Sequence, residues 1–224
     1  MLIVFDLDDT LVDTSASITP FLQERALKKL VEAGLQLPCF DEGLAMLRSI
    51  DATASSGKNA VKEFLELQDG LHYLDLALHT IYEAPQFERP IQPVDYALDL
   101  LRQLVKDHTL GIVTAGYPSI QREKIALSGI NPSYFSFIEC CPEGYKKPTY
   151  QKMMKSLGID PRDVAVCGDR ISVDLAPAKE LGWKTIHFRY GRGLGRTGLK
   201  SDVDYTILRL EEIPKLIRQI ENNL

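Results

Sequence analysis

The chain has 224 residues, which suits one core domain with a smaller inserted domain better than two large domains. Its composition, 45% hydrophobic and 25% charged, is typical of a soluble globular protein. The net charge of -5 argues against a surface for nucleic acid or anionic membrane. None of the four cysteines forms a CxxC pair, so we expect reduced thiols and a cytoplasmic location. No signal peptide or membrane span is expected, because the first apolar run is far too short.

The chain opens with an apolar run, Leu2–Phe5, that predicts a buried strand. Asp6 and Asp8 follow it, and Thr10 comes two residues later. Because Asp is a poor strand residue, both carboxylates should lie where the strand ends. Ligands bind outside the carboxyl ends of the strands in open α/β sheets. The first residues therefore predict a ligand site at this edge.

Helical patterns dominate the next 70 or so residues. We predict helices from Thr14–Ser15 to Val31, over Asp41–Ile50, over Lys58–Leu67 and over Leu71–Tyr82. A segment with three prolines, residues 84–93, should lead the chain back. The sequence thus predicts an all-helical cap domain at residues 14–89, inserted into a core made of residues 1–13 and 90–224.

From Val94 onward, helical and strand patterns alternate. Such alternation predicts a doubly wound, Rossmann-like α/β fold, in which helices cover both faces of a parallel sheet. We also expect a Gly-rich loop at Gly191–Ser201. The predicted elements are the helices Val94–Asp107, Ser119–Leu127, Thr149–Leu157, Leu175–Leu181 and Leu210–Ile220, and the strands Leu110–Thr114, Tyr134–Glu139, Val164–Cys167, Lys184–Phe188 and Tyr205–Ile207.

Three of the predicted buried strands end in polar residues: Asp6, Thr114 and Asp169. Parallel strands bring these ends to one edge of the sheet, and Asp174 and the pair Lys146-Lys147 follow in nearby segments. Several carboxylates in one cleft repel each other unless a cation balances them. Oxygen ligands without His or thiolate suit Mg²⁺.

A site of this composition can carry phosphoryl transfer. A lysine and the Thr114 hydroxyl would stabilise a bound phosphoryl group. One carboxylate could attack phosphorus, and the second could protonate the leaving oxygen and later activate water.

The chain resembles the haloacid dehalogenase-like (HAD) superfamily of phosphohydrolases, in the branch with a small helical cap of the C1 type. The resemblance rests on four motifs in the family's order: DxDxT from Asp6, the strand end at Thr114, Lys147-Pro148, and GDxxxxD over Gly168–Asp174.

The resemblance implies a role for each matched residue. Asp6 would be the nucleophile and Asp8 the general acid and base. Thr114 and the backbone N–H of Ala115 would hold the phosphoryl group, together with Lys147, which is favoured over Lys146 because it directly precedes Pro148. Mg²⁺ would be bound by the Asp6 carboxylate, the Asp8 backbone carbonyl and Asp169, and Asp174 would be a further ligand or a support.

Three positions depart from the common family pattern. Ala115 stands where Asn is frequent, so a side-chain contact to phosphate is lost. Asp9 replaces the commoner Gly. Arg170 stands where Ser is common, and two roles remain open for it: pairing with a carboxylate or contacting the substrate.

The expected function is Mg²⁺-dependent hydrolysis of a small phosphomonoester, such as a sugar phosphate or nucleotide, through an aspartyl-phosphate on Asp6. The cap should exclude water during the reaction. The alternatives are a phosphomutase, another enzyme of the superfamily such as a dehalogenase or phosphonate hydrolase, or a non-catalytic binding protein that keeps the fold. The expected partner is a small phosphorylated metabolite, with no nucleic acid or membrane, and the chain could be a monomer or a homodimer.

Overall fold

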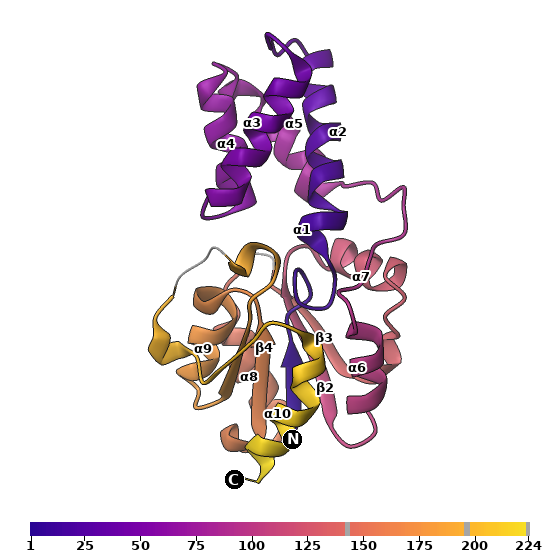
Figure 1. The fold of residues 1–224 in the computed structure, drawn as a ribbon, viewed down its shortest axis with the longest axis vertical. Helices are drawn as coiled ribbons and strands as arrows, with labels where there is room; N and C mark the ends of the chain where they lie inside the picture. The colour runs from indigo at the N-terminus through magenta and orange to yellow at the C-terminus, as the bar shows by residue number, and fades with distance from the viewer. Residues whose placement is uncertain (142–143, 195–197, 223–224) are drawn as a thin grey trace. The chain divides into compact units, whose positions relative to one another are not determined.

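The computed structural model describes residues 1–141, 144–194 and 198–222 (Figure 1). It divides into two compact units. The core unit comprises Met1–Ser15 and Pro90–Leu224, and the helical unit comprises Ala16–Arg89. Within the expected Gly-rich loop, residues 195–197 lie outside the described residues.

The core unit is built on a six-stranded parallel sheet with strand order β3-β2-β1-β4-β5-β6. The sequence therefore predicted the fold class correctly, as a doubly wound α/β sheet, and the structure places the first strand near its centre. The strands are β1 (Leu2–Phe5), β2 (Thr109–Ala115), β3 (Phe135–Cys141), β4 (Val164–Gly168), β5 (Lys184–Phe188) and β6 (Tyr205–Ile207).

Strand β1 lies between β2 and β4, and all four of its residues are buried. A strand covered on both faces needs a continuous apolar run, which Leu2–Phe5 supplies. At its end, Phe5 is in register with Ile112 of β2 and Cys167 of β4. Asp6 follows at once, and its backbone N–H donates to the Cys167 carbonyl at 2.9 Å. The register thus places Asp6 beside the ends of both neighbouring strands.

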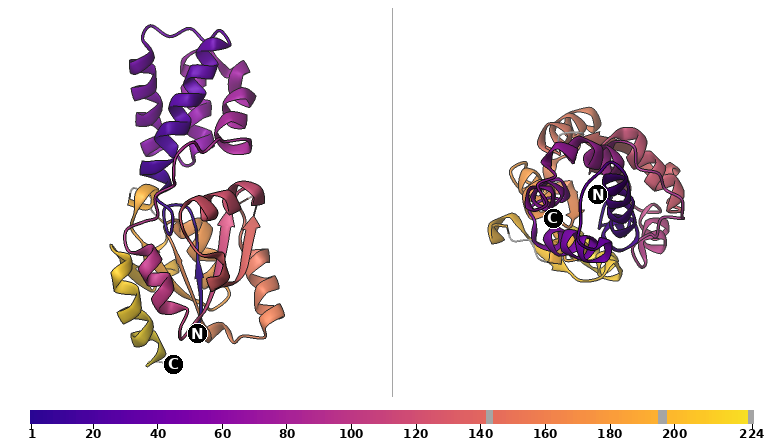
Figure 2. Two further views of the ribbon diagram at one scale, coloured as in Figure 1. Left: turned by 90° about the vertical axis from the view of Figure 1, so that its right-hand side faces the viewer. Right: turned by 90° about the horizontal axis from the view of Figure 1, so that it is seen from above.

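Helices cover both faces of the sheet. Helices α6 and α10 lie together on one face, and α8 lies on the other (Figure 2). On the α8 face, Tyr150 and Met153 join Val4, Val166 and Trp183 in one buried cluster. The helices of this unit are α6 (Ala97–Leu104), α7 (Pro118–Leu127), α8 (Lys147–Leu157), α9 (Ala176–Lys179) and α10 (Ile213–Glu221).

The helical unit packs four helices around its own apolar centre, which includes Leu27, Leu30 and Phe64. Helix α2 contacts α3 and α5, and α4 contacts the same two helices. No helix among the described residues is long and apolar enough to cross a membrane. The helices are α2 (Thr19–Glu32), α3 (Phe40–Thr53), α4 (Gly57–Leu67) and α5 (Leu74–Leu78), while α1 (Thr14–Ser17) spans the boundary between the units.

Three of the expected helices differ in the structure: two are interrupted, and the third starts earlier than expected. The first breaks at Ile18 into α1 and α2, where Pro20 at the start of α2 has no N–H to continue the ladder. The second becomes a short 3₁₀ turn, α5 and a π-helical turn at His79–Glu83. The third begins with a π-helical turn at Ile171–Leu175, in which the Asp174 carboxylate accepts a hydrogen bond from the Arg170 backbone N–H at 2.9 Å.

The segment before β6 is tied to β5 by Asp204. Its carboxylate accepts hydrogen bonds from the backbone N–H and the hydroxyl of Thr185, at 3.0 and 3.2 Å, and pairs with Lys179. Burial acts to raise the pKa of Asp204, but these bonds and the Lys179 charge lower it overall. A lowered pKa means that the carboxylate stabilises the fold above its unfolded pKa, and that this contribution is lost as the pH falls through the folded pKa.

Asp204→Asn is therefore expected to lower the free energy of unfolding at pH 7 by about 1–2 kcal/mol, because hydrogen bonds to a charged acceptor become neutral ones. The deficit should be smaller near pH 3, below the ordinary pKa of Asp, because the stabilisation by the ionised carboxylate is lost as the pH falls toward the lowered folded pKa. Urea unfolding at pH 7 and near pH 3 measures the deficit in the free energy of unfolding. Asp202→Asn is the matched control, because Asp202 binds Thr185 through its backbone carbonyl. An equal deficit at both pH values would contradict this account.

Candidate active site

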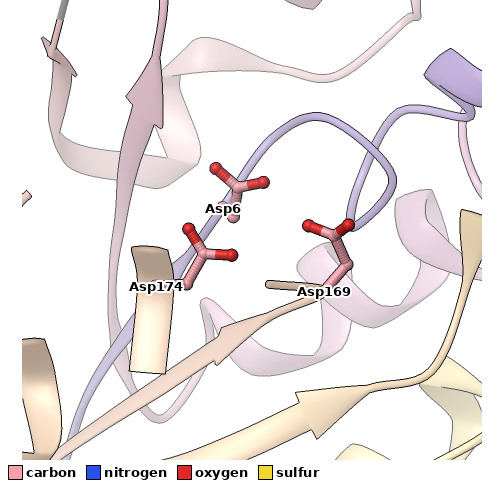
Figure 3. Close-up of side chains that lie close together, drawn as sticks. All are labelled: Asp6, Asp169 and Asp174. Atoms are coloured by element: carbon pink, nitrogen blue, oxygen red, sulfur yellow. The ribbon is translucent and has the colours of Figure 1, made fainter. Parts of the chain in front are cut away.

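Three buried carboxylates meet at the carboxyl edge of the sheet. Asp6 follows β1, Asp169 follows β4, and Asp174 lies in the π-helical turn beyond it. Carboxylate oxygens of the three lie within 4.8 Å of one another, and none of the three residues is more than 2% exposed. Figure 3 shows the carboxylates grouped around a common space. The structure thus brings together three of the residues that the sequence singled out.

The geometry and chemistry of this cluster fit a hard divalent cation. Asp6 Oδ2 and Asp169 Oδ1 are buried and accept no hydrogen bond from the described residues. Buried carboxylate oxygens without partners are costly, and a cation would satisfy both of them. The donor set consists of oxygen atoms alone, which suits Mg²⁺.

The electrostatics of the cluster also favour a bound cation, which would stabilise the ionised carboxylates. Burial raises the pKa of Asp6 to about 6, although Lys146 partly opposes the shift. Burial and the nearby Asp174 and Asp6 carboxylates raise the pKa of Asp169 well above its usual value. Burial acts in the same direction on Asp174, but Lys146 and Arg170 outweigh it and lower its pKa. Lys146 and Arg170 therefore leave the Asp169 charge insufficiently compensated.

The lysine that lies at the carboxylate cluster is Lys146, and not Lys147, which the sequence favoured. Lys146 is fully buried, and its Nζ lies 2.5 Å from Asp6 Oδ1 and 2.6 Å from Asp174 Oδ1. Lys147 instead pairs with Glu180, and its side chain is 29% exposed. Helix α8 begins at Lys147, so Lys146 is the residue that caps it. Successive helical residues point about 100° apart, and only one of two adjacent lysines can reach the sheet edge.

Asp8 lies outside the three-carboxylate cluster and has partners of its own. Its Oδ1 accepts hydrogen bonds from Thr14 Oγ1 at 2.5 Å and Lys124 Nζ at 2.6 Å, and its Oδ2 accepts one from Gln121 Nε2 at 2.8 Å. Burial acts to raise the pKa of Asp8, but the Lys124 charge and these bonds lower it to about 2. Its surroundings therefore favour the ionised carboxylate.

Thr114 and Ala115 end strand β2 beside Asp8, and one side chain connects all three. Thr114 is fully buried, and its Oγ1 accepts a hydrogen bond from Gln121 Nε2 at 2.6 Å. The same nitrogen lies 2.9 Å from the Ala115 carbonyl. Gln121 thus links the end of β2 to the loop that carries Asp8.

The two other departures from the family pattern also have structural explanations. Asp9 adopts a left-handed backbone conformation, φ +56°, which explains why Gly is common there. Its carboxylate accepts hydrogen bonds from the Ser15 N–H at 2.7 Å and the Ser15 hydroxyl at 2.5 Å. A Cβ at Gly191 would lie 2.5 Å from Asp9 Cγ, so this position requires glycine. Arg170 Nε lies 4.0 Å from Asp169 Oδ1, which favours carboxylate pairing for Arg170.

Sequence reasoning missed three residues of the site: Gln121, Lys124 and His187. Gln121 and Lys124 are three residues apart on α7, which places them on one face of the helix, but so common a spacing is a weak signal. His187 Nε2 lies 3.1 Å from the Asp169 backbone carbonyl, and burial lowers its pKa. A buried histidine inside a strand pattern gave no comparable signal.

The fold and this site define a class of protein. The family model for haloacid dehalogenase-like hydrolases matches residues 1–182. The chain belongs to this family, as the sequence motifs predicted, and it is an enzyme of the phosphoric monoester hydrolase class.

Two curated relatives match along nearly their whole length. A glyceraldehyde 3-phosphate phosphatase from Pyrococcus abyssi is 30% identical over 98% of this chain and 93% of its own. A protein of the same name from Methanocaldococcus jannaschii is 28% identical over 99% of this chain and 98% of its own.

Solved structures support the fold. A crystal structure described as a predicted phosphoglycolate phosphatase, from Haemophilus somnus, has a TM-score of 0.71 at 21% identity and covers 96% of each chain. A magnesium-bound HAD hydrolase from Bacillus subtilis has a TM-score of 0.68 at 19% identity, covering 96% of this chain and 97% of its own.

Proposed function

We propose that the protein hydrolyses a small sugar phosphate, with glyceraldehyde 3-phosphate the first candidate, through an aspartyl-phosphate on Asp6. The observation that carries this proposal is the cluster of Asp6, Asp169 and Asp174, with Lys146 buried among them. The names of the two curated relatives support the choice of substrate. Nucleotides and other phosphomonoesters are the alternatives within the same reaction.

Asp6, Asp169 and Asp174 would hold Mg²⁺ through their carboxylates, and Asp8 would contribute its backbone carbonyl. When bound, the ion would neutralise the charge of the phosphoryl oxygens and of the carboxylates around them. Lys146 holds one oxygen of the Asp6 carboxylate, and this fixes the direction in which the other oxygen points.

The reaction then has two steps. Asp6 forms a bond to phosphorus while the bond to the leaving oxygen breaks, and Asp8 gives its proton to that oxygen. In the second step Asp8 takes a proton from water, the water oxygen attacks phosphorus, and Asp6 leaves as a carboxylate with inorganic phosphate as the product. The surroundings of Asp8 favour the ionised form, which is the form needed for the second step.

Thr114, Ala115 and Lys146 would hold the phosphoryl oxygens during both steps. The Thr114 hydroxyl and the Ala115 backbone N–H come from the end of β2, and the Lys146 ammonium comes from the start of α8. Fixed donors around a transferring phosphoryl group stabilise its transition state, each by a few kcal/mol.

Phosphate release from a panel of phosphorylated metabolites, with and without Mg²⁺, tests the proposed function. We expect release to require Mg²⁺ and kcat/KM to be highest for glyceraldehyde 3-phosphate or another small sugar phosphate. Isomerised sugar phosphate without phosphate release would indicate a phosphomutase instead. No turnover of any substrate would contradict the proposal.

Mg²⁺ should also stabilise the fold, because it binds the native cluster and not the unfolded chain. At 100 times its Kd, a ligand adds about 2.7 kcal/mol to the free energy of unfolding. In Asp169→Asn this increment should largely disappear, while the metal-free protein becomes more stable, because burial and two neighbouring carboxylates raise the Asp169 pKa and make its charge unfavourable at pH 7. Thermal unfolding with EDTA and with Mg²⁺ measures both effects. An unchanged response in the variant would contradict the assignment.

A further inference from the structure

Two side chains of helix α7 contact Asp8, although neither belongs to the motifs that define the site. Gln121 Nε2 is 2.8 Å from Asp8 Oδ2, and Lys124 Nζ is 2.6 Å from Asp8 Oδ1. Gln121 is 1% exposed, and the Lys124 side chain is 11% exposed. Their three-residue spacing puts both on one face of the helix. Burying an amide and an ammonium here is favourable only because the carboxylate accepts their hydrogen bonds.

We propose that Gln121 and Lys124 are positioning residues for the reaction: together they hold the Asp8 carboxylate and the Thr114 hydroxyl in their working orientations. The inference rests on the proposed role of Asp8 as proton donor and acceptor. Neither residue touches the reacting atoms in this scheme, and each acts through Asp8 or Thr114.

Gln121 connects the proton-transferring residue to the phosphoryl-binding residue. Its Nε2 carries two hydrogens and faces three acceptors: Asp8 Oδ2, Thr114 Oγ1 and the Ala115 carbonyl. Because Thr114 Oγ1 accepts from this nitrogen, the single hydrogen of the hydroxyl remains available to donate to a phosphoryl oxygen. Gln121 thus sets both the donor direction of Thr114 and its spacing from Asp8.

Lys124 restrains the half of Asp8 that Gln121 does not contact. The Asp8 side chain is 28% exposed, so solvent alone would allow it several orientations. A charge-assisted bond from Lys124 to Oδ1, beside the bond from Thr14, selects one of them. A misplacement of about 1 Å in a catalytic group can lower the rate about 10²-fold.

The leaving-group dependence of kcat/KM distinguishes this role from a purely structural one. Loss of the proton donor should lower kcat/KM strongly for an alkyl phosphate, because its alkoxide leaving group must be protonated. The same loss should change kcat/KM little for p-nitrophenyl phosphate, because its leaving group departs as a stable anion. A general loss of structure would lower both values together.

The test compares Lys124→Met and Gln121→Met with Asp8→Asn and the wild type on both substrates, using the best alkyl phosphate from the metabolite panel. We expect Lys124→Met to lose about 10²-fold in kcat/KM on the alkyl phosphate and less than about threefold on p-nitrophenyl phosphate, as Asp8→Asn should. Gln121→Met should lose activity on both substrates, and more on the alkyl phosphate, because Gln121 also orients the Thr114 hydroxyl. Lys124→Arg should recover part of the loss. Arg122→Met, an exposed cation on the same helix, is the matched control and should behave as wild type.

A double-mutant cycle makes the test independent of any single variant. If Lys124 acts through Asp8, adding Lys124→Met to Asp8→Asn should cost little more on the alkyl phosphate. Additive losses, or equal losses on both substrates in variants whose thermal unfolding matches the wild type, would overturn the inference. If Gln121→Met does not fold, Lys124→Met and Lys124→Arg still allow the comparison of the two substrates. A wild-type protein inactive on both substrates would instead overturn the proposed function.

Discussion

Asp6→Asn is expected to abolish phosphate release, with kcat lower by about 10⁴-fold or more, because an amide oxygen cannot replace the carboxylate that attacks phosphorus. The substitution keeps the size of the side chain and removes one of the charges paired with Lys146. Phosphate release with saturating Mg²⁺ measures the effect, and thermal unfolding confirms that the variant is folded. Asp163→Asn, at an exposed position before β4, is the control. Wild-type rates in Asp6→Asn would rule out Asp6 as the nucleophile.

Lys146→Met is expected to have the next largest effect, and it acts on both stability and activity. Losing this ammonium leaves the Asp6 and Asp174 carboxylates buried without their shared cation, and breaking a buried pair costs about 3–5 kcal/mol. The variant also loses a hydrogen-bond donor to the phosphoryl group, which should lower kcat by about 10²-fold. Urea unfolding and phosphate release measure the two effects.

Lys147→Met is the matched control for that variant. The two lysines are adjacent, but Lys147 pairs with Glu180 at the surface, and an exposed ion pair contributes little to stability. We expect near wild-type activity and stability. If Lys147→Met were inactive and Lys146→Met active, the assignment from the structure would be wrong and the assignment from the sequence right.

The two lysines also show what sequence reasoning could and could not settle. The motif placed a lysine before Pro148, and both candidates are present there. Which one faces the site depends on where α8 begins, because one residue changes the direction of a helical side chain by about 100°. Helix starts are the part of a helix that local sequence defines least, since their orphan N–H groups can be satisfied in several ways.

The sheet and its carboxylates were predictable for a physical reason. A strand buried on both faces must be apolar throughout, so Leu2–Phe5 was easily recognised, and the polar residue that follows it must lie at the edge. The same logic placed Thr114 and Asp169 at the ends of β2 and β4. Parallel pairing then brought these ends together without any information about side-chain contacts.

The partners of Asp8 were not predictable in the same way. Gln121 is more than 100 residues away from Asp8 along the chain, and Lys124 is three residues further on. Their contacts depend on how α7 turns as it leaves β2, which tertiary packing decides. A polar residue on a helix is more often solvated than buried, so the pattern alone did not distinguish these two from their exposed neighbours Arg122 and Glu123.

The most direct test of the account is to trap the covalent intermediate. Turnover of a ³²P-labelled sugar phosphate would be stopped with acid, in the wild type and in Asp8→Asn, where the second step lacks its base. Peptide mapping should then find a phosphoryl group on Asp6, labile to hydroxylamine as an acyl phosphate is, and more abundant in Asp8→Asn. Label on another residue, or turnover with no covalent phosphate in either protein, would contradict the central claim that Asp6 is the nucleophile.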